Sequence, residues 1–223
     1  MVRARLAHLY LRSRFLLFQR HRHRRLVLER FAGHPLVVLP EVFNPNLFIT
    51  TPFFATTLSP ELVPPSSDVL DIGTGSGALA IVAAHLGRSV TAVDINPHAV
   101  RCARLNVLLN RCDDRVSVVE GDMFAPLGGR RFDVVLCNPP FYRGEPRDAW
   151  DASWRSPDFF GRFASSLADH LTPRGHALVL LSSRAEADGF LPRCHSSGLA
   201  TDLLRRRQTV LESFTVYRIR KAA

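Results

Sequence analysis

The sequence of 223 residues predicts a single α/β domain built on a mostly parallel sheet. An apolar run at residues 69–72 is followed by a glycine-rich turn and by a helical pattern at residues 78–86. Three further apolar runs, at residues 89–93, 115–119 and 132–136, each end in small or polar residues. Apolar runs of this length are typical of buried parallel strands. Because open α/β sheets bind ligands at the carboxyl ends of their strands, these ends predict a binding site.

The glycine-rich turn has the spacing Gly-x-Gly-x-Gly. Gly73, Gly75 and Gly77 allow unusual backbone angles and let a ligand approach the main chain, although an ordinary tight turn would also contain glycines. The dinucleotide fingerprint is Gly-x-Gly-x-x-Gly, so the spacing here argues against a bound pyrophosphate. Asp71 argues the same way, because a carboxylate repels a pyrophosphate but attracts a cofactor that carries a sulfonium and an amino group.

The ends of the other three strands carry polar residues of the same kind. Asp94 ends the second strand, at the distance where an acid meets ribose hydroxyls in nucleotide-binding βαβ units. It would also fit a helix cap before Asn96 and Pro97. The third strand runs into Gly121-Asp122-Met123, and the fourth runs into Cys137-Asn138-Pro139-Pro140-Phe141.

Taken together, the motifs at residues 69–77, 92–97, 121–124 and 138–141 resemble those of class I S-adenosylmethionine-dependent methyltransferases. They are most similar to the release-factor (HemK/PrmC-type) glutamine methyltransferases and to small-domain relatives that methylate exocyclic amines of nucleic-acid bases. The resemblance covers residues 35–220. It implies a Rossmann-like, seven-stranded, mostly parallel sheet with an antiparallel last strand, helices on both faces, and S-adenosyl-L-methionine as the cofactor.

The resemblance also implies where the cofactor binds. Asp122 would accept a hydrogen bond from the adenine amino group, and the thioether of Met123 would pack on the ring. The acid Asp94 would meet the ribose. The full set of expected cofactor contacts is Asp71, Gly73, Thr74, Gly75, Ser76, Gly77, Asp94, Ile95, Asp122, Met123 and Asn138.

The segment Asn138-Pro139-Pro140-Phe141 is the predicted catalytic motif. Methyl transfer from a sulfonium is an in-line displacement, so the enzyme must mainly hold the acceptor nitrogen in line with the methyl group. The Asn138 side-chain oxygen and the Pro139 carbonyl would each accept one N–H of a planar amide or amine. Pro139 and Pro140 would keep these acceptors rigid, and Phe141 would stack on a flat group. The alternative is a plain proline turn after a strand.

The first 30 residues hold nine arginines and one acid, and so carry most of the formal net charge of +9. We expect residues 1–30 to form a basic helical extension and residues 31–223 to form the methyltransferase domain. Arginine at this density can contact nucleic acid. It would also fit a solvated helix, a cover over the active site, or an organelle targeting segment.

Cysteine usage and hydropathy limit the remaining classes of protein. The four cysteines, at positions 102, 112, 137 and 194, lack the spacing of metal ligands, so we expect reduced thiols, no metal and a cytoplasmic protein. The sequence contains no apolar run of about 18 residues, so we expect no membrane span.

Elements before and after the motifs complete the predicted fold. Residues 26–39 suggest a hairpin that turns at residues 32–33. A helix is expected over residues 97–110, packing Val100, Ala103, Leu105 and either Leu108 or Leu109 against the sheet. Toward the end of the chain we expect helices at residues 157–171 and 185–194, a strand at residues 176–181, and an antiparallel pair at residues 199–204 and 214–219.

Two groups of aromatic residues flank the motifs. One group, before the glycine turn, is Phe43, Phe48, Phe53 and Phe54, and the other, after the catalytic motif, is Trp150, Trp154, Phe159 and Phe160. The first group could line an aromatic pocket, although aromatic residues at such spacing more often belong to the core, and the second would suit a lid over the substrate or, equally, the core.

The methyl acceptor stays open at this point. A protein glutamine is favoured by motif similarity, but we expect no separate helical substrate domain before the methyltransferase domain. Asn44, Asn46, Thr50 and Thr51 also replace charged residues of that family. A nucleic-acid base is favoured by the basic leader, and a small amine or amide by the brevity of the chain. A non-catalytic cofactor-binding or RNA-binding module is the fourth alternative.

Overall fold

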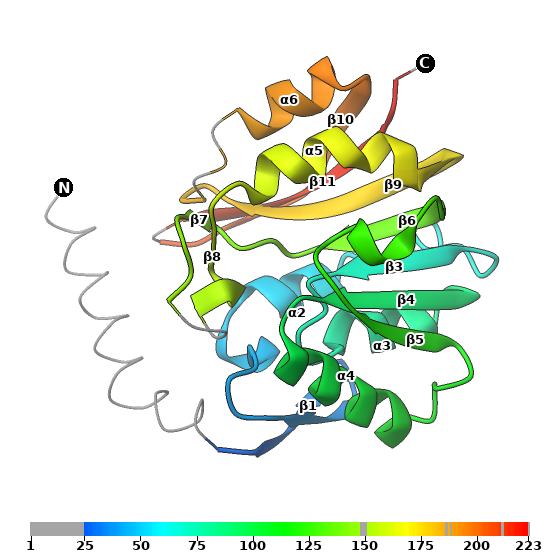
Figure 1. Cartoon of the computed structure of the whole chain (residues 1–223), viewed down its shortest axis with the longest axis vertical. Coiled ribbons are helices and arrows are strands. Elements are labelled where there is room, and N and C mark those ends of the chain that lie inside the picture. Colours follow the sequence, from blue (N-terminus) through cyan, green and yellow to red (C-terminus); the bar gives the residue numbers. More distant parts are fainter. Residues whose placement is uncertain (1–24, 148–150, 186, 188, 211, 223) are drawn as a thin grey trace, which may run out of the picture.

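The computed structural model of this chain describes residues 25–147, 151–185, 187, 189–210 and 212–222 (Figure 1). Most of the predicted basic extension, residues 1–24, lies outside the described residues, and so does Trp150. The described chain begins with a short hairpin whose first strand, β1 (Val27–Phe31), already includes the end of that predicted segment.

A seven-stranded sheet runs through the molecule (Figure 1). Its strands, in chain order, are β3 (Asp68–Ile72), β4 (Ser89–Asp94), β5 (Val116–Glu120), β6 (Phe132–Cys137), β9 (Leu171–Ser182), β10 (Leu199–Gln208) and β11 (Ser213–Lys221). Their spatial order is β10-β11-β9-β6-β3-β4-β5. Only β11 runs against its neighbours β9 and β10, because the other ladders are parallel. The predicted sheet with an antiparallel last strand is confirmed.

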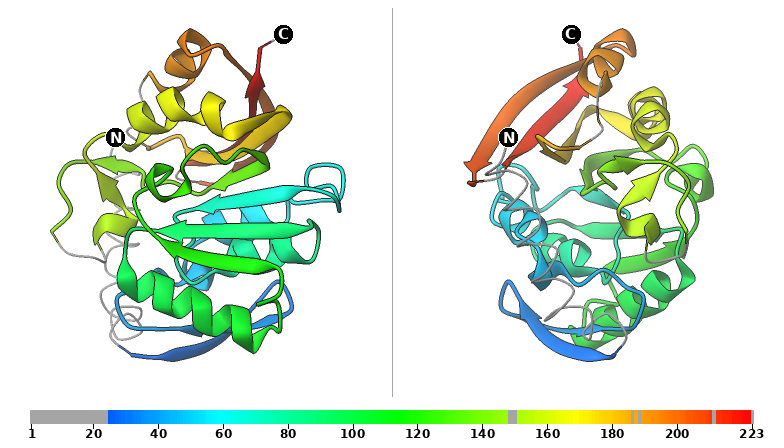
Figure 2. Two further views of the ribbon diagram at one scale, coloured as in Figure 1. Left: turned by 45° about the vertical axis from the view of Figure 1, so that its right-hand side comes forward. Right: turned by 90° about the vertical axis from the view of Figure 1, so that its left-hand side faces the viewer.

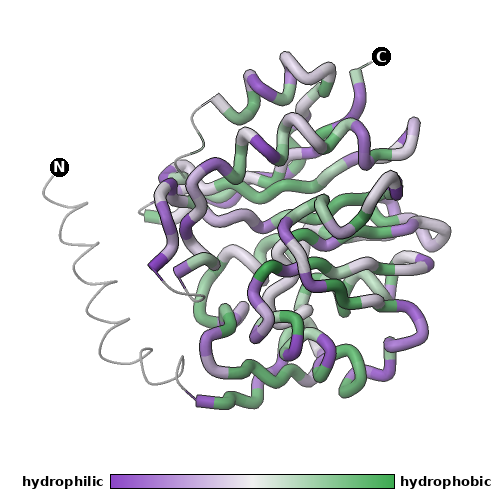
Figure 3. Tube along the Cα trace, in the orientation of Figure 1, coloured by the Kyte–Doolittle hydropathy of each residue, from purple (hydrophilic) through white to green (hydrophobic). Residues whose placement is uncertain are grey.

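The central strands are buried on both faces, which explains their continuous apolar sequences. Val69 and Leu70 of β3 and Val134, Val135 and Leu136 of β6 are fully buried. Figure 3 shows hydrophobic stretches along the strands in the middle of the molecule. Helices cover both sides of these strands, so side chains pointing either way enter a core.

One face carries the first half of the chain. Its elements are β1, β2 (His34–Val38), η2 (Pro45–Leu47), α2 (Thr50–Ala55), α3 (Ala78–Ala84) and α4 (Pro97–Leu109). The predicted hairpin is confirmed: β1 and β2 pair antiparallel around Ala32 and Gly33, both with positive φ, as a tight hairpin turn requires. Figure 2 shows this hairpin at the lower edge of the molecule, beneath α4.

The opposite face carries η3 (Ala125–Leu127), α5 (Phe159–His170) and α6 (Phe190–Ser196). α5 buries Phe163 and Leu167, and α6 buries Phe190 and Cys194. α6 begins at Phe190 rather than at residue 185, directly after Gly189, which has φ of +78°. Between β6 and α5 the chain forms a small flap from β7 (Tyr142–Arg143), η4 (Asp151–Ser153) and β8 (Arg155–Ser156).

The predicted leucine face of α4 is wrong, because Leu105, Leu108 and Leu109 are 42%, 60% and 46% exposed. Val100 and Ala103 are buried as expected. The helix instead turns small and polar residues inward, and these let it approach the sheet and the hairpin closely. The buried residues of α4 are Ala99, Val100, Cys102, Ala103, Asn106 and Val107.

Asn106 is a fully buried amide that joins three parts of this face. Its Oδ1 accepts a hydrogen bond from the Val37 N–H at 2.7 Å, and its Nδ2 donates to the Val37 carbonyl at 2.7 Å. The same Nδ2 also donates to the Ser76 carbonyl, in the glycine-rich turn, at 2.8 Å. Asn106 thus gives the Val37 N–H and carbonyl the two hydrogen bonds that a neighbouring strand would provide. It also anchors the glycine-rich turn through the Ser76 carbonyl.

The described residues contain no helix with the length and hydropathy that a membrane span requires. All four cysteines fall within the described residues, where each is free and buried. Burial raises the pKa of the Cys102 thiol to about 11 and that of Cys194 to about 12. A neutral, buried thiol is a poor nucleophile, so these two cysteines act as core side chains.

We predict that Asn106→Ala lowers the free energy of unfolding by about 2 to 4 kcal/mol, because it leaves the Val37 and Ser76 backbone groups buried without their partner. Leu108→Ala, on the exposed face of the same helix, should change it by less than about 0.5 kcal/mol. Urea unfolding followed by circular dichroism measures both. Equal effects of the two substitutions would contradict the role given to Asn106.

Candidate active site

The carboxyl ends of β3, β4, β5 and β6 open on one cavity of about 350 Å³. A cavity of this size is sufficient for a nucleoside-like ligand. Most of the residues predicted from the sequence line it: Gly73, Thr74, Gly75, Ser76, Asp94, Ile95, Asp122, Met123, Asn138, Pro139, Pro140 and Phe141. Asp71 and Gly77 do not line it, because Asp71 is buried beneath the glycine-rich turn and Gly77 lies against Ala103 of α4.

The glycine-rich turn after β3 is hydrogen-bonded to the end of the neighbouring strand, β4. The Gly73 and Thr74 N–H groups donate to the Val93 carbonyl at 2.9 and 3.0 Å. Gly75 has φ of +56°, and its N–H donates to Asp94 Oδ2 at 2.8 Å. These bonds fix the turn before any ligand arrives, and they leave its outer side facing the cavity.

Gly77 holds the helices together rather than facing the cavity. It has φ of +82°, and a Cβ at this position would lie 3.2 Å from both the Cα and the Cβ of Ala103. The absence of a side chain therefore lets α3 approach α4. The sequence pattern detected the glycine correctly but could not separate a ligand contact from a helix contact.

Asp71 lies beneath the turn, with 1% of its surface exposed. Its Oδ2 accepts a hydrogen bond from the Thr74 hydroxyl at 2.6 Å. Burial raises the pKa of Asp71 to about 7, and the nearby Asp94 carboxylate raises it as well, while the Thr74 bond opposes them. Asp71 is therefore a buried acid whose charge is sensitive to pH near neutrality and to any cation above it.

Asp94 shapes the loop after β4. Its Oδ1 accepts from the Asn96 N–H at 2.9 Å, and its Oδ2 accepts from the Gly75 N–H at 2.8 Å. Burial raises its pKa, although both backbone bonds oppose this shift. The cap of α4 is Asn96, whose side chain accepts from the His98 N–H at 2.9 Å. Asp94 thus does not cap the helix but presents its carboxylate to the cavity beside the exposed Ile95.

Asp122 and Met123 follow β5 in a tight turn. The backbone at Gly121 passes so close to Pro126 that a Cβ there would lie 2.6 Å from the proline ring. Met123 takes φ of +51° in the same turn. Asp122 forms an ion pair with Arg162 of α5, whose side chain also lines the cavity. Sequence reasoning missed Arg162, because a helix residue 40 positions from its partner carries no local signal.

Asn138 comes directly after β6 and points its amide toward α2. Its Nδ2 donates to the Thr51 hydroxyl at 3.3 Å. With the nitrogen turned to Thr51, the Oδ1 atom is the one left for a ligand, and it has no hydrogen-bond donor among the described residues. Thr51 was noted in the sequence only as a departure from a family pattern, so its role as a support for Asn138 was missed.

The two aromatic groups divide between cavity and core. Phe43 and Trp154 line the cavity, together with Phe159. The Phe43 ring stacks on Phe48 with centroids 5.0 Å apart, and Trp154 meets Phe48 edge-on at 4.6 Å. Phe53, Phe54 and Phe160 are buried in the core, whereas Phe48 is partly buried between the Phe43 and Trp154 rings.

The described part of the chain holds no cluster of three or more histidine, cysteine, aspartate or glutamate residues that would suit a metal ion. The polar groups in the cavity are instead carboxylates, side-chain amides, hydroxyls, backbone groups and the guanidinium groups of Arg155 and Arg162. This set is suited to binding an organic, partly cationic ligand and to orienting a neutral N–H group.

Comparison with known proteins gives a family for this arrangement. The family model "Methyltransferase small domain" matches residues 35–191. The chain is 40% identical over 121 residues to the ribosomal protein uL3 glutamine methyltransferase of Bradyrhizobium diazoefficiens, covering 48% of this chain and 38% of that protein. It is 36% identical over 141 residues to the tRNA1(Val) (adenine(37)-N6)-methyltransferase of Vibrio vulnificus, covering 60% of this chain and 58% of that protein.

A solved structure supports the fold. The T. thermophilus 16S rRNA N2 G1207 methyltransferase in complex with AdoMet and guanosine superposes with a TM-score of 0.68 at 22% identity, over 89% of this chain and 50% of that one. The chain thus matches less than two thirds of the length of both curated relatives and of this structure.

The raised pKa of Asp71 predicts how stability depends on pH. Between about pH 4 and pH 7 the folded chain keeps a proton that the unfolded chain has lost, so this group destabilises the fold as pH rises. We expect Asp71→Asn to be more stabilising, relative to the wild type, at pH 8 than at pH 5. Urea unfolding at the two pH values measures the difference. Asp113→Asn, an exposed aspartate, is the control, and an Asp71 difference no larger than that control contradicts the prediction.

Proposed function

Because this chain belongs to the methyltransferase small-domain family, we propose that it is an S-adenosyl-L-methionine-dependent N-methyltransferase acting on a planar amide or amine nitrogen. One observation carries the proposal. Asn138 and Pro139 line the same cavity as the glycine turn, Asp94 and Asp122. The predicted acceptor site and the predicted cofactor site are therefore parts of one space.

The residues of the cavity fit this cofactor. Asp94 is oriented by two backbone N–H groups, which leaves its carboxylate available to ribose hydroxyls. Asp122 and Met123 line the cavity and would contact the adenine, and Arg162 forms an ion pair with the Asp122 carboxylate. Asp71 lies under the turn, where a cation in the cavity would favour its ionised form.

When bound, the cofactor supplies a methyl group made electrophilic by the neighbouring sulfonium. The task left to the protein is to hold the acceptor nitrogen in line with that methyl group. The Asn138 Oδ1 atom and the Pro139 carbonyl each accept one N–H of an NH₂ group, and both acceptors are rigid. Thr51 holds the amide of Asn138, and the following prolines restrict the backbone.

The same two acceptors also serve the reaction itself. As the nitrogen gains its fourth bond it becomes positive, and two oxygen dipoles aimed at its hydrogens stabilise that charge. The extra proton leaves after the transfer, so no side chain has to act as a base beforehand. Phe141 and the rings of Phe43 and Trp154 border the cavity, which suits an acceptor group that is flat.

Two acceptor groups share this geometry. The relatives are named for the glutamine of a ribosomal protein and for an adenine of a tRNA. A carboxamide and an exocyclic base amine both present a planar NH₂ group with two N–H donors. The site around Asn138 suits both, so the choice between them depends on surfaces outside the cavity.

We predict that Asn138→Ala lowers methyl transfer by about 10²- to 10³-fold, because one of the two oriented acceptors is lost. The assay is transfer of label from S-adenosyl-L-methionine to a fractionated cell extract. Binding of the cofactor, measured by calorimetry, should fall far less than methyl transfer. Asn110→Ala, at the end of α4 outside the cavity, is the matched control and should retain activity.

The labelled fraction identifies the acceptor class by its sensitivity to protease or nuclease. Label that is independent of Asn138 would contradict the role of the motif. A cofactor that binds without any labelled fraction would contradict the proposed enzyme and favour a binding module.

A further inference from the structure

Near its end at Gln208, strand β10 carries three consecutive exposed arginines, Arg205, Arg206 and Arg207, which we call the β10 arginine surface. β10 is the edge strand of the sheet and pairs with β11 alone among the described strands. Figure 2 shows β10 and β11 as a ribbon that extends beyond the rest of the molecule. Because neighbouring residues of a strand project to opposite faces, these arginines present positive charge on both sides of the edge.

Charge on the β10–β11 ribbon is unequal along its length. At one end, Arg218 and Arg220 both contact Asp202 at 3.2 Å, so a carboxylate compensates them. At the other end, the described residues give no acidic partner to the three arginines. Arg205 donates to the Thr56 carbonyl at 2.7 Å, and Arg206 donates to the Ser213 hydroxyl at 3.0 Å. Neutral acceptors leave the positive charge of a guanidinium uncompensated.

The uncompensated end is the one nearer the cavity. β10 runs parallel to β3 and β6, because β11 between β10 and β9 is antiparallel to both, so its last residues lie at the sheet edge where the cavity opens. Arg205 contacts Thr56 at the end of α2 and lies over the Phe53 ring, 5.4 Å from its centre. The first residues of α2, Thr50 and Thr51, line the cavity. A helix of six residues spans about 9 Å, so the two sites are close.

We propose that the β10 arginine surface docks the phosphate backbone of an RNA whose base enters the cavity. The inference rests on the proposed function and names its substrate class. Exposed guanidinium groups bind phosphates through paired N–H donors, and Arg205 is already fixed by Thr56 and Phe53. A basic protein acceptor would be repelled by the same surface. RNA carries both phosphates, which fit the charge outside the cavity, and planar base amines, which fit the site within it.

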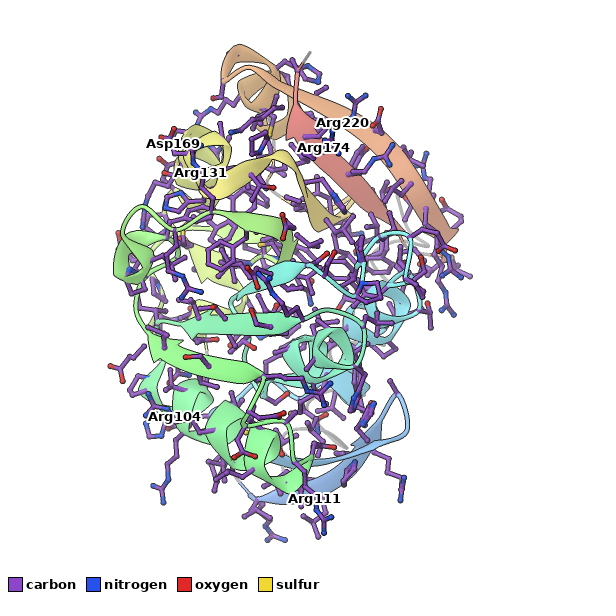
Figure 4. All side chains as sticks on the ribbon, turned by 90° about the vertical axis from the view of Figure 1, so that its right-hand side faces the viewer. Arg104, Arg111, Arg131, Asp169, Arg174 and Arg220 are labelled. Atoms are coloured by element: carbon purple, nitrogen blue, oxygen red, sulfur yellow. The ribbon has the colours of Figure 1, made fainter. Side chains whose placement is uncertain are left out.

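The test compares two double variants that remove the same charge from different places. Arg206→Gln/Arg207→Gln alters the β10 arginine surface, and Arg101→Gln/Arg104→Gln alters α4. Figure 4 shows Arg104 at the opposite end of the molecule from Arg220 of β11. The probe is fluorescently labelled bulk transfer RNA, with anisotropy measured from 50 to 200 mM salt. Calorimetric binding of S-adenosyl-L-methionine checks that both variants fold.

We expect the β10 variant to bind the RNA about tenfold more weakly at 100 mM salt and to lower the slope of log affinity against log salt by about 1.5, the value for two lost phosphate contacts. The α4 variant should stay within about twofold of the wild type. Equal losses in the two variants would mean that only net charge matters, and would overturn the proposal. An unchanged affinity in the β10 variant would overturn it as well.

Methyl transfer separates this inference from the proposed function. If Asn138-dependent label enters RNA and falls about tenfold in the β10 variant, both stand. If Asn138-dependent label enters a protein, DNA or a small molecule, the enzyme stands and the RNA surface is overturned. If RNA binds through β10 but nothing is methylated, the enzyme fails while the docking surface stands.

Discussion

Parallel pairing of β3 with both β4 and β6 is the constraint on which the site depends. It brings the loops after three strands, far apart in sequence, to one edge of the sheet. One hydrogen bond then fixes two of these loops together, because the Gly75 N–H donates to Asp94. A cavity built from separate loops on a rigid sheet can hold its polar groups at constant distances, which a reaction controlled by alignment requires.

The face that carries α4 and the hairpin supports this edge from below. Asn106 replaces a missing strand neighbour for β2 and at the same time holds the Ser76 carbonyl of the glycine turn. Gly77 contributes the close contact of α3 with α4. The geometry of the turn is therefore set by packing on its far side as well as by the strand before it, and a change in the hairpin layer would reach the cavity through Asn106.

Much of this arrangement could be predicted from the sequence, since apolar runs, turn residues and glycine spacing indicate the strands, the hairpin and the glycine turn over a few neighbouring residues. The contacts that complete the site are not local. Thr51 and Asn138 are 87 residues apart, and Arg162 and Asp122 are 40 residues apart. The leucines of α4 were misplaced for a related reason: a helix packed between a sheet and a hairpin buries small residues and an amide, so hydrophobicity alone did not indicate its inner face.

The glycine turn at the cavity is bordered by carboxylates, whereas the β10 arginine surface outside the cavity is positively charged. The carboxylates affect how tightly the cofactor binds before and after methyl transfer. Beneath and beside the glycine turn lie two carboxylates, Asp71 and Asp94, whose pKa values are raised by burial, so a cation in the cavity would favour their ionised forms. On the proposed function, the cofactor's sulfonium would be that cation, and its positive charge would be lost on methyl transfer. The attraction that favours binding of the cofactor is then lost, so the acidic floor binds the reactant more tightly than the product.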